Sequence, residues 1–348
     1  MCRQKHANVA IFVPHAGCPH QCSFCNQRAI SGASRQPEAQ DVRDACETAL
    51  RTMRVDAAQS EIAFFGGSFT AIDRRVMCSL LEAAAPYVKA GRFKGIRVST
   101  RPDAVDGEVL SLLRHYGVSA VELGAQSMDD AVLAANGRGH TAADVERAST
   151  AIHEAGLELG LQMMTGLYAS SDEQDEATAR RLAALKPRTM RLYPTIVMEH
   201  TALAAYYREG CYTPPTLEQA VTLCTRLLTF FEEEQGIPVI RLGLHAGQEM
   251  QQGRLAGPWH PAFRELCEGE RLYERTLTAL RAQLPQGGVV TIQIAPAFVS
   301  RMIGHKRRNV QRFDQAGYTV TVQSDPTLAP GNFHILKNLQ LSGMERLD

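Results

Sequence analysis

The sequence predicts an α/β protein in which a partial or full (β/α) barrel is followed by a small α+β module. Two observations lead to this prediction. Short β-rich runs alternate with longer amphipathic helical patterns through most of the 348 residues. Beyond His245 the alternation stops, and a loop rich in Gly, Gln and Pro leads to a helix and then to a strand–helix–helix–strand pattern.

The predicted strands are apolar runs bounded by polar residues or glycine: Val9–Val13, Glu61–Phe65, Gly95–Thr100, Ser119–Gly124, Glu158–Met164, Thr189–Pro194 and Pro238–Leu244. The helices expected between them are Asp41–Met53, Arg74–Val88, Gly107–His115, Ala142–Glu154, Glu173–Leu185 and Leu217–Glu234. Strand–helix alternation implies a parallel sheet covered by helices. Because so many units exceed what a small open sheet needs, the pattern favours a barrel, whose chemistry gathers at the carboxyl ends of the strands.

The domain boundaries follow from the change of pattern. We expect the barrel at residues 1–246, then a linker with a helical extension at residues 247–286. The compact module is expected at residues 287–325, followed by a tail at residues 326–348. The proline and paired glycines near residue 287 mark the end of the linker, because these residues favour turns.

The composition is that of an ordinary globular protein, with 45% hydrophobic and 21% charged residues. Thirty-seven basic residues balance thirty-seven acidic ones, so the overall charge gives no reason to expect a polyanionic partner. No run approaches the ~18 consecutive apolar residues of a membrane span, and the start of the chain lacks a signal-peptide core. We therefore expect a cytoplasmic protein with no membrane partner.

Three of the nine cysteines are clustered as C-x-x-x-C-x-x-C: Cys18, Cys22 and Cys25. Disulfides are disfavoured in a reducing compartment, so clustered cysteines there suggest metal binding or redox chemistry. Three thiolates on one tight loop can bind three corners of a [4Fe–4S] cube and leave the fourth iron open to a small molecule. Zinc is the main alternative, because His15 and His20 are near, although no second pair of ligands accompanies the loop. Inert thiols are the other alternative.

The cysteine spacing, with the aromatic Phe24 directly before the last cysteine, resembles the signature of the radical S-adenosylmethionine (SAM) superfamily. This resemblance implies that the open iron chelates the amino and carboxylate groups of SAM. It implies that an electron from the cluster then cleaves the sulfonium to give a 5′-deoxyadenosyl radical. It also implies an electron donor such as flavodoxin or ferredoxin. The cofactor carries this chemistry, while the protein orients it and excludes competing reactions.

Paired glycines, Gly66 and Gly67, follow the second predicted strand. They let the backbone approach a ligand closely, because no Cβ blocks it, although a plain tight turn is the simpler alternative. With Ser68 they resemble the Gly-Gly-Glu element of the superfamily, which contacts the SAM amino group. Ser68 stands where the acid often is, so charge pairing with the ammonium is lost and backbone carbonyls would carry more of that role.

Segments further along the chain resemble two branches of the superfamily. The segment Val98–Asp103 resembles the Elongator catalytic-subunit family. Val121–Ser127, followed by Gly137–His140, resembles both that family and oxygen-independent coproporphyrinogen III oxidase. In those relatives a glutamine and an arginine help hold SAM through its ribose and carboxylate. The resemblance gives these roles to Gln126 and Arg138, whose amide and guanidinium groups suit such partners.

Other positions are less defined. Ser99 and Gln162 stand where the relatives often carry acids, and His140 is expected to be a structural hydrogen-bonding residue. For Gln126 or Arg138 taken alone, the simpler alternative is a loop residue hydrogen-bonded to the backbone. Four more polar residues lie either at the barrel mouth or in ordinary salt bridges and core packing: Arg191, Tyr193, Arg241 and His245.

The strand–helix–helix–strand pattern from Ile292 to Val322 resembles a KH-type nucleic-acid-binding core. In KH modules a G-x-x-G loop clamps the backbone of a few single-stranded nucleotides. Gly304 is the first glycine of that loop, and Arg307 replaces the second. Lys306, Arg307 and Arg308 put positive charge where phosphate would lie. The alternative is a small cap whose basic face is merely solvated.

Together these resemblances imply a radical SAM enzyme of the Elongator-like branch, without the acetyltransferase domain, that modifies tRNA or another RNA. One alternative is small-molecule chemistry like that of coproporphyrinogen oxidase. Another is an RNA-binding protein with a structural or redox-sensing cluster. The paired glycines, Gln126 and Arg138 argue against this last alternative, because a sensor needs no SAM site.

Overall fold

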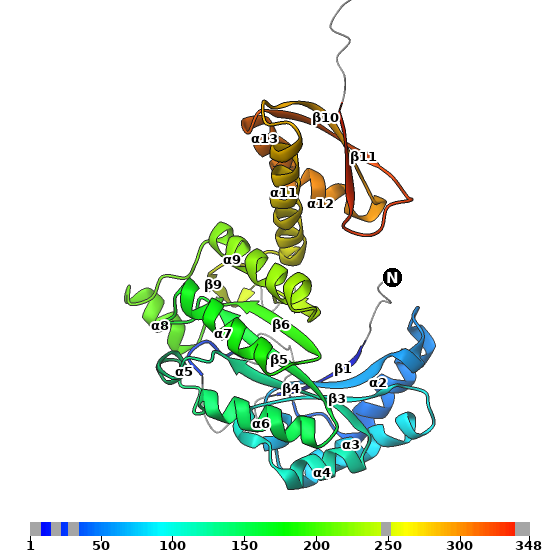
Figure 1. The fold of residues 1–348 in the computed structure, drawn as a ribbon. Coiled ribbons are helices and arrows are strands. Elements are labelled where there is room, and N and C mark those ends of the chain that lie inside the picture. Colours follow the sequence, from blue (N-terminus) through cyan, green and yellow to red (C-terminus); the bar gives the residue numbers. More distant parts are fainter. Residues whose placement is uncertain (1–7, 15–21, 27–34, 245–251, 338–348) are drawn as a thin grey trace, which may run out of the picture. The chain divides into compact units, whose positions relative to one another are not determined.

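The computed structural model describes residues 8–14, 22–26, 35–244 and 252–337. They form two compact units, divided between Pro261 and Ala262. Figure 1 shows both units coloured along the chain. Each unit is described by itself below.

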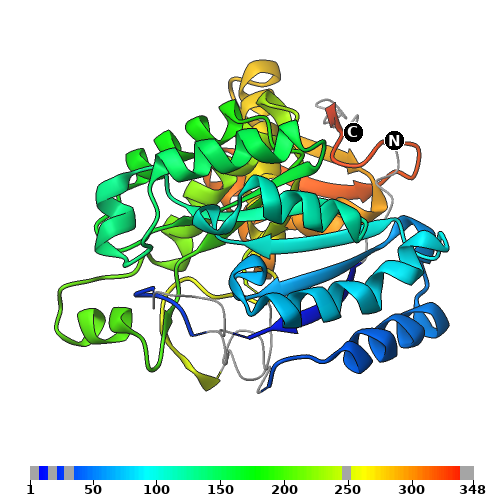
Figure 2. The ribbon, with the colours of Figure 1, turned by 90° about the horizontal axis from the view of Figure 1, so that it is seen from below.

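The N-terminal unit is built on a seven-stranded parallel sheet with the order β1-β2-β3-β4-β5-β6-β8. Its strands are Asn8–Val13 (β1), Glu61–Gly66 (β2), Gly95–Thr100 (β3), Val118–Gln126 (β4), Glu158–Thr165 (β5), Thr189–Pro194 (β6) and Val239–Leu242 (β8). The strands follow the chain order and the sheet curls, with helices on its outer side (Figures 1 and 2). Because β1 and β8 are the two ends of the sheet, the barrel is open. The predicted α/β barrel is therefore confirmed in its partial form.

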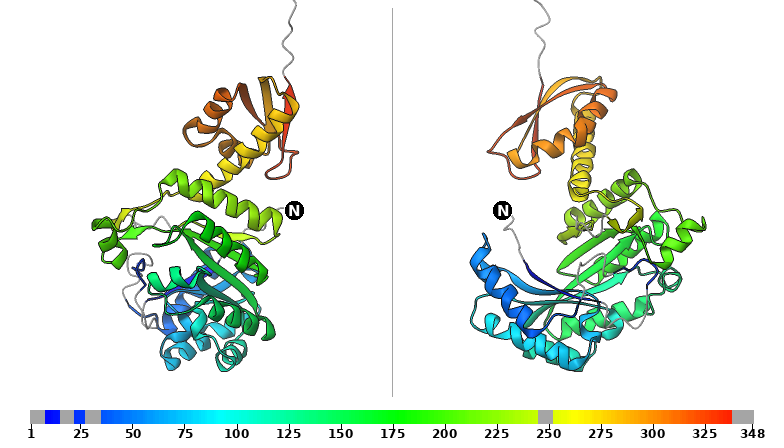
Figure 3. Two further views of the ribbon diagram at one scale, coloured as in Figure 1. Left: turned by 60° about the vertical axis from the view of Figure 1, so that its left-hand side comes forward. Right: turned by 180° about the vertical axis from the view of Figure 1, so that it is seen from behind.

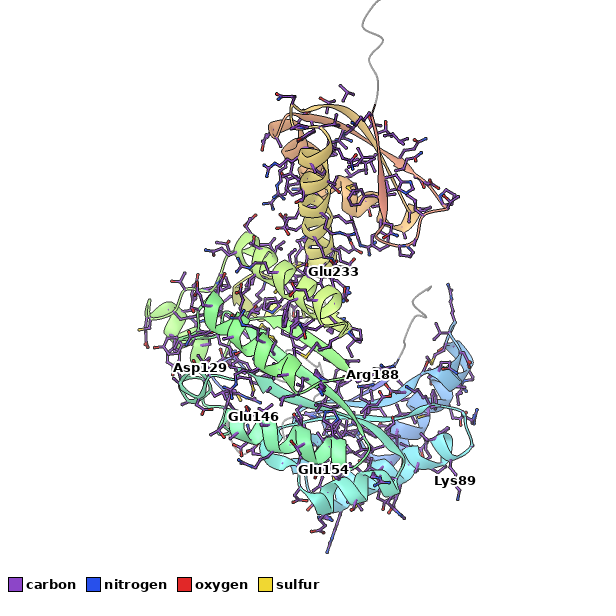
Figure 4. All side chains as sticks on the ribbon, viewed as in Figure 1. Lys89, Asp129, Glu146, Glu154, Arg188 and Glu233 are labelled. Atoms are coloured by element: carbon purple, nitrogen blue, oxygen red, sulfur yellow. The ribbon has the colours of Figure 1, made fainter. Side chains whose placement is uncertain are left out.

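Helices connect the strands and cover the sheet: Ala39–Thr52 (α2), Arg74–Lys89 (α3), Gly107–His115 (α4), Asp130–Ala135 (α5), Ala142–Glu154 (α6), Asp172–Ala184 (α7) and Leu217–Thr229 (α9), which continues into a π-helical turn at Phe230–Glu234. Local signals fix where they begin. Thr141, Ser171 and Thr216 form capping boxes at α6, α7 and α9, each satisfying backbone N–H groups of the first turn. Exposed charged side chains such as Lys89 and Glu154 lie on the outer helices (Figure 4). Among the residues that the structure describes, no helix is both long and apolar enough to cross a membrane.

A small substructure follows β6 that the sequence pattern did not predict. Strand β7 (Val197–Met198) pairs antiparallel with β9 (Arg254–Ala256), and helix α8 (Ala202–Arg208) follows β7. Val197, Leu203 and Tyr212 from this region are buried against residues of the cysteine loop. The substructure therefore completes the wall beside that loop.

The C-terminal unit places helices against a three-stranded sheet (Figure 3). Its elements are Phe263–Gln283 (α11), Gly288–Ile294 (β10), Val299–Ile303 (α12), Arg308–Gln315 (α13), Tyr318–Ser324 (β11) and Phe333–Lys337 (β12). The central strand β10 pairs parallel with β11 and antiparallel with β12. This arrangement contains the strand–helix–helix–strand order that the sequence predicted.

The C-terminal unit is larger than the module expected at residues 287–325. Helix α11, which the sequence analysis placed in the linker, contributes Leu272, Tyr273 and Leu280 to the unit's core. Strand β12, which was placed in the tail, packs Phe333 and Ile335 against the same core. A sheet of two strands has too little apolar surface to form a stable core alone, so the neighbouring helix and strand belong to the fold.

Candidate active site

A cavity of ≈ 210 Å³ lies at the carboxyl ends of the strands in the N-terminal unit. Its wall contains Cys22 and Cys25 of the cysteine loop. It also contains all eight residues that the sequence analysis proposed for cofactor binding: Phe24, Gly66, Gly67, Ser68, Ser99, Gln126, Arg138 and Gln162. The third cysteine, Cys18, lies outside the described residues. The parallel sheet thus brings together residues that are far apart in the sequence.

The cysteine loop is held in place by hydrogen bonds around Ser23. The Ser23 N–H donates to the Asn136 carbonyl oxygen (3.0 Å), and the Ser23 hydroxyl donates to Asn136 Oδ1 (2.7 Å). The Leu203 N–H donates to the Ser23 carbonyl oxygen (2.8 Å). Asn136 is fully buried. The sequence analysis did not single out Asn136; the available signal was its place directly before the Gly137–His140 segment.

Apolar side chains surround the described part of the loop. Cys22 and Phe24 are buried in one cluster with Val132, Leu167 and Leu203. Such surroundings exclude water, which strengthens electrostatic interactions at the sulfur atoms.

The paired glycines join the end of β2 to the end of β1. The Gly67 N–H donates to the Val13 carbonyl oxygen (2.8 Å). Gly66 has φ of +113°, and a Cβ added there would lie 2.5 Å from the same oxygen. Only glycine fits at this position without a shift of the backbone. The close approach fixes the strand end that leads into the cysteine loop.

Ser68 uses its hydroxyl within the protein. Its Oγ lies 2.8 Å from Thr100 Oγ1 and accepts a hydrogen bond from the Arg101 N–H (3.2 Å). Thr100 Oγ1 in turn lies 2.5 Å from Thr70 Oγ1. This chain of hydroxyl groups ties the end of β2 to the end of β3 and gives Ser68 a structural role at the cavity wall.

The end of β4 is shaped around Gln126. This residue has φ of +66°, and the register of β4 against β5 shifts between Gly124 and Gln126. Its Oε1 accepts a hydrogen bond from Gln162 Nε2 (3.2 Å). A Cβ added at Gly124 would lie 2.9 Å from Gln126 Nε2, so the glycine leaves room for this amide. Two amides, from adjacent strands, therefore meet at the cavity wall.

Arg138 connects the end of β4 with the cysteine loop. Its Nη1 lies 3.1 Å from Cys22 Sγ, and its Nη2 donates to the Gly124 carbonyl oxygen (2.7 Å). The side chain is buried, and its Nε has no hydrogen-bond partner among the described residues. The Arg101 guanidinium donates to the Arg138 carbonyl oxygen (2.5 Å). The guanidinium is therefore fixed beside the sulfur of Cys22 in the cysteine loop.

His140 lies behind this segment and is buried. Its Nε2 is 3.2 Å from the Ala125 carbonyl oxygen. Burial and the neighbouring Arg138 charge lower the pKa of His140 to about 4. The imidazole is therefore neutral at neutral pH, which agrees with the expected structural role.

Two family models match the chain consecutively. The radical SAM superfamily model matches residues 12–182, and the radical SAM C-terminal domain model matches residues 187–273. The first match includes every described residue of the cavity wall from Phe12 to Gln162. The chain belongs to the radical SAM superfamily.

Relatives of this radical SAM protein have names connected with tRNA. The chain is 30% identical over 239 residues to a tRNA uridine(34) acetyltransferase of Dehalococcoides mccartyi, which covers 59% of this chain and 52% of that protein. A protein of the same name from Methanocaldococcus jannaschii is 24% identical, covering 62% and 47%. The chain thus spans about half the length of these curated relatives.

A solved structure shares the fold. The archaeal Elp3 of Methanocaldococcus infernus, with an N-terminal deletion, aligns with a TM-score of 0.61 and 18% identity. The alignment covers 78% of this radical SAM chain and 63% of that one. It supports the predicted (β/α) barrel type of fold, here in its partial form.

The radical SAM family implies a [4Fe–4S] cluster and SAM, and the cavity suits both. Cys22 and Cys25 place in the cavity wall thiol sulfurs of the kind that iron–sulfur clusters favour as ligands. The neighbouring Arg138 guanidinium complements the negative charge of thiolates. The buried Arg138 Nε without a partner and the glycine-lined wall leave donors and space for a polar ligand.

A network of mostly buried charges runs through the sheet of this radical SAM protein and reaches the cavity wall at Glu122 and Arg191. Arg97 pairs with Glu61 (2.7 Å) and with Glu122 (3.3 Å), and Glu122 also pairs with Arg191 (2.7 Å). The Ser99 hydroxyl donates to Glu122 as well (3.3 Å). Sequence reasoning missed Arg97 and Glu122; their signal was a charged residue in the middle of each predicted strand. The network fixes Arg191 and Ser99 in the cavity wall.

The other polar residues considered for the barrel mouth divide into two groups. Tyr193 lines the cavity with Arg191. Arg241 does not belong to the described residues that line the cavity, and its Nε donates to the Gly243 carbonyl oxygen (3.0 Å). His245 lies outside the described residues.

The basic loop of the C-terminal unit, residues 304–308, is described separately. Gly304, Lys306 and Arg307 all have positive φ angles, of 78°, 50° and 63°. The side chains of Lys306, Arg307 and Arg308 are exposed. A Cβ added at Gly304 would lie 2.8 Å from the backbone nitrogen of Asn309. This close approach explains why glycine occupies the first glycine position of the motif.

Two other arginines near the basic loop are engaged within the unit. Arg301 pairs with Glu268 (2.6 Å), and Arg312 pairs with Glu270 (2.5 and 2.8 Å), both acids belonging to α11. The sequence showed no acid between residues 300 and 312, and the folded unit brings the acids from elsewhere. Of the basic residues between 300 and 312, the exposed ones are therefore those of the basic loop.

Proposed function

We propose that this enzyme holds a [4Fe–4S] cluster through Cys18, Cys22 and Cys25 and binds SAM in the adjoining cavity. The observation that carries the proposal is the presence of Cys22 and Cys25 in one wall with the paired glycines and Arg138. When bound, the cluster supplies the electron that cleaves SAM to a 5′-deoxyadenosyl radical. The residues of the chain bind and orient SAM and keep water out.

The polar groups of the wall suggest separate contacts with SAM. We assign the backbone of Gly66 and Gly67 to the amino group, because no side chain blocks approach there. Gln126, with Gln162 and Ser99 near it, is assigned to the ribose side, since amides pair with hydroxyl groups. Arg138 is assigned to the carboxylate.

We propose that the substrate is a tRNA or another structured RNA. The names of the relatives support this proposal, and so does the exposed basic loop with Gly304, Lys306, Arg307 and Arg308. A KH-like unit would hold a single-stranded segment through its phosphates. A tRNA substrate would place the reaction in the cytoplasm, where a flavodoxin or ferredoxin would supply the electron.

Production of 5′-deoxyadenosine tests the cofactor assignment. Anaerobically reconstituted protein, given dithionite and SAM, is expected to release this product, measured by chromatography. Cys22→Ala and Cys25→Ala should each abolish it and lower the iron content. Cys46→Ala is the matched control, because that thiol is buried on α2, away from the cavity. Zinc in the anaerobically purified protein, or iron content unaffected by both cavity variants, would contradict the proposal.

RNA binding is tested separately on the full chain. The double variant Lys306→Glu with Arg307→Glu is expected to lower tRNA affinity about tenfold or more, because two phosphate contacts become repulsive. Lys89→Glu, which reverses an exposed charge on α3, is the control and should change little. Equal binding by all three proteins would exclude the basic loop as an RNA contact. Comparing the modified nucleosides of tRNA from wild-type and deletion strains then identifies the reaction, and an unchanged pattern would contradict a tRNA substrate.

A further inference from the structure

Arg138, which the proposed function assigns to the SAM carboxylate, also contacts the sulfur of Cys22. Nη1 of the guanidinium lies 3.1 Å from Cys22 Sγ in the cysteine loop, and Nη2 donates to the Gly124 carbonyl oxygen at 2.7 Å. We propose that Arg138 is a positioning residue that raises the reduction potential of the cluster by donating a hydrogen bond to the sulfur of Cys22. This inference rests on the proposed function, since it requires that Cys22 bind the cluster.

The direction of the effect follows from charge. A cluster that gains one electron from an external low-potential donor becomes more negative, and part of that charge resides on its sulfur ligands. A cationic N–H donor at such a sulfur stabilises the reduced form more than the oxidised form. Hydrogen bonds to sulfur and the degree of burial are among the factors that set the potentials of iron–sulfur clusters. Arg138 is 7% exposed, so water screens this interaction little.

The position of the guanidinium is fixed from several sides. The carbonyl oxygen of Arg138 accepts a hydrogen bond from the Arg101 guanidinium, which is itself paired with Asp103 at 2.9 Å. Two residues earlier, Asn136 binds Ser23 through both its side chain and its backbone. The segment from Asn136 to Arg138 therefore holds the cysteine loop at two adjacent residues, Cys22 and Ser23. A donor that is held this firmly is available to the sulfur before any ligand binds.

The same geometry connects the two cofactors. Gly124 and Gln126 belong to the wall assigned to SAM, and a Cβ at Gly124 would lie 3.5 Å from Arg138 Nη2. A ligand carboxylate drawn to Arg138 therefore competes with Cys22 for the same cation. We expect the potential of the cluster to fall when SAM binds to the wild-type protein, because the donor is then shared.

The test measures the midpoint potential of the reconstituted cluster by redox titration monitored by electron paramagnetic resonance. Arg138→Met keeps the length of the side chain and removes its charge and donors. Its potential is expected to be more negative than that of the wild type, and to respond less to SAM. Arg138→Lys, which keeps the charge without the two-pronged geometry, is expected to lie between them.

Arg191→Met is the matched control, because it removes a cation that is 12% exposed in the same cavity wall and that pairs with Glu122 rather than with sulfur. A potential for Arg138→Met equal to that of the wild type overturns the inference. So does a shift of the same size in Arg191→Met, which would show a general effect of charge. If the wild-type protein itself forms no cluster, the proposed function and this inference both fail.

Loss of the cluster from the variants is also decisive. If both Arg138 variants lose iron while their apo forms keep the wild-type melting temperature, the arginine serves to retain the cluster rather than to set its potential, and the inference is overturned. If they lose iron together with a lower melting temperature, Arg138 serves the fold and the inference is overturned.

Discussion

The cavity wall and the basic loop represent two different ways of presenting polar groups. In the wall, Arg138, Gln126 and Ser68 are buried and each is bonded to another part of the protein. In the basic loop, Lys306 and Arg307 are exposed, and the structure records no side-chain hydrogen bond for either within the residues it describes. The difference teaches that the cavity wall holds its polar groups in fixed positions, whereas the basic loop offers exposed positive charge without fixing the side chains that carry it.

Both regions contain a non-glycine residue with a left-handed backbone, and again the settings differ. Gln126, with φ of +66°, has its side chain held by Gln162. Arg307, with φ of +63°, follows Lys306, which is also left-handed. Such conformations cost of order 1–3 kcal/mol and persist where the surroundings impose them. In the cavity wall, side-chain contacts hold the backbone of Gln126 in this conformation. In the basic loop, the flanking helices α12 and α13 hold the backbone of Arg307.

The largest effect is expected where the charges beneath the cavity are broken. Arg97→Met leaves the fully buried Glu61 without its 2.7 Å partner, which should lower the free energy of unfolding by about 3–5 kcal/mol. Arg92→Met removes an exposed arginine 3.4 Å from Glu47 and should cost less than about 1 kcal/mol. Urea unfolding of both variants measures the contrast. Equal losses would mean that the buried network is no more important than a surface pair.

A second prediction concerns pH, which acts on buried charges. Burial raises the pKa of Asp175 from 3.8 to about 6, although Gly166 N–H and Ser170 donate to it. Its contribution to stability is complete below pH 3.8 and is lost as the pH rises through about 6. Asp175→Asn should therefore gain up to about 3 kcal/mol relative to the wild type as the pH is raised across that range.

Asp129→Asn is the control for this pH prediction. Backbone hydrogen bonds at the start of α5 lower the pKa of Asp129, so its contribution is present above its usual pKa and lost as the pH falls. Its variant should lose stability relative to the wild type as the pH rises, the opposite sign. Thermal unfolding across the acidic range distinguishes the two variants. A constant difference between Asp175→Asn and the wild type would contradict the prediction.

The close approach at Gly66 gives a smaller effect. Gly66→Ala should cost about 2 kcal/mol and reduce iron retention, because its Cβ would overlap the Val13 oxygen at the start of the cysteine loop. Gly91→Ala shares the left-handed backbone, with φ of +67°, but meets no atom within 4 Å. Melting temperature and iron content of the two variants separate steric overlap from backbone strain. Normal iron retention in Gly66→Ala would show that the wall tolerates displacement.

The smallest effect is expected in the basic loop. Arg307→Gly removes the left-handed strain and should change stability by less than about 1 kcal/mol, because glycine also gains entropy in the unfolded chain. The slope of log affinity for RNA against log salt should decrease by about one, since one phosphate contact is lost. Gln126→Gly is the comparison in the wall, where loss of the Gln162 contact should outweigh any relief of strain. An unchanged salt slope would mean that Arg307 does not contact phosphate.

The sequence predicted the large elements well because their patterns are regular. Strand β6 and helices α4 and α6 begin and end where the apolar pattern indicated. Helix α8 and the pair β7–β9 were missed, because they are too short to show a period. Strand β12 was missed because its pairing with β10 depends on a partner about forty residues earlier in the chain.

The candidate site was partly predictable for similar reasons. Cys22, Gly66 and Arg138 belong to short motifs, and the structure places them in one cavity wall. The roles of Asn136 and Glu122 were not predictable, because a hydrogen bond to a distant backbone atom and a buried ion pair leave no local pattern. The same holds for Glu270, which pairs with Arg312 across 42 positions of the sequence.

The hydrogen bonds that hold the cysteine loop also set an order of events during synthesis. Ser23 is fixed by Asn136 and by Leu203, which leave the ribosome long after the cysteines. At a synthesis rate of about 5–20 residues per second, the thiols spend many seconds without the contacts that shape them. Insertion of the cluster is therefore expected only after translation has passed helix α8. Until then the nascent chain depends on the cell to protect those thiols from oxygen.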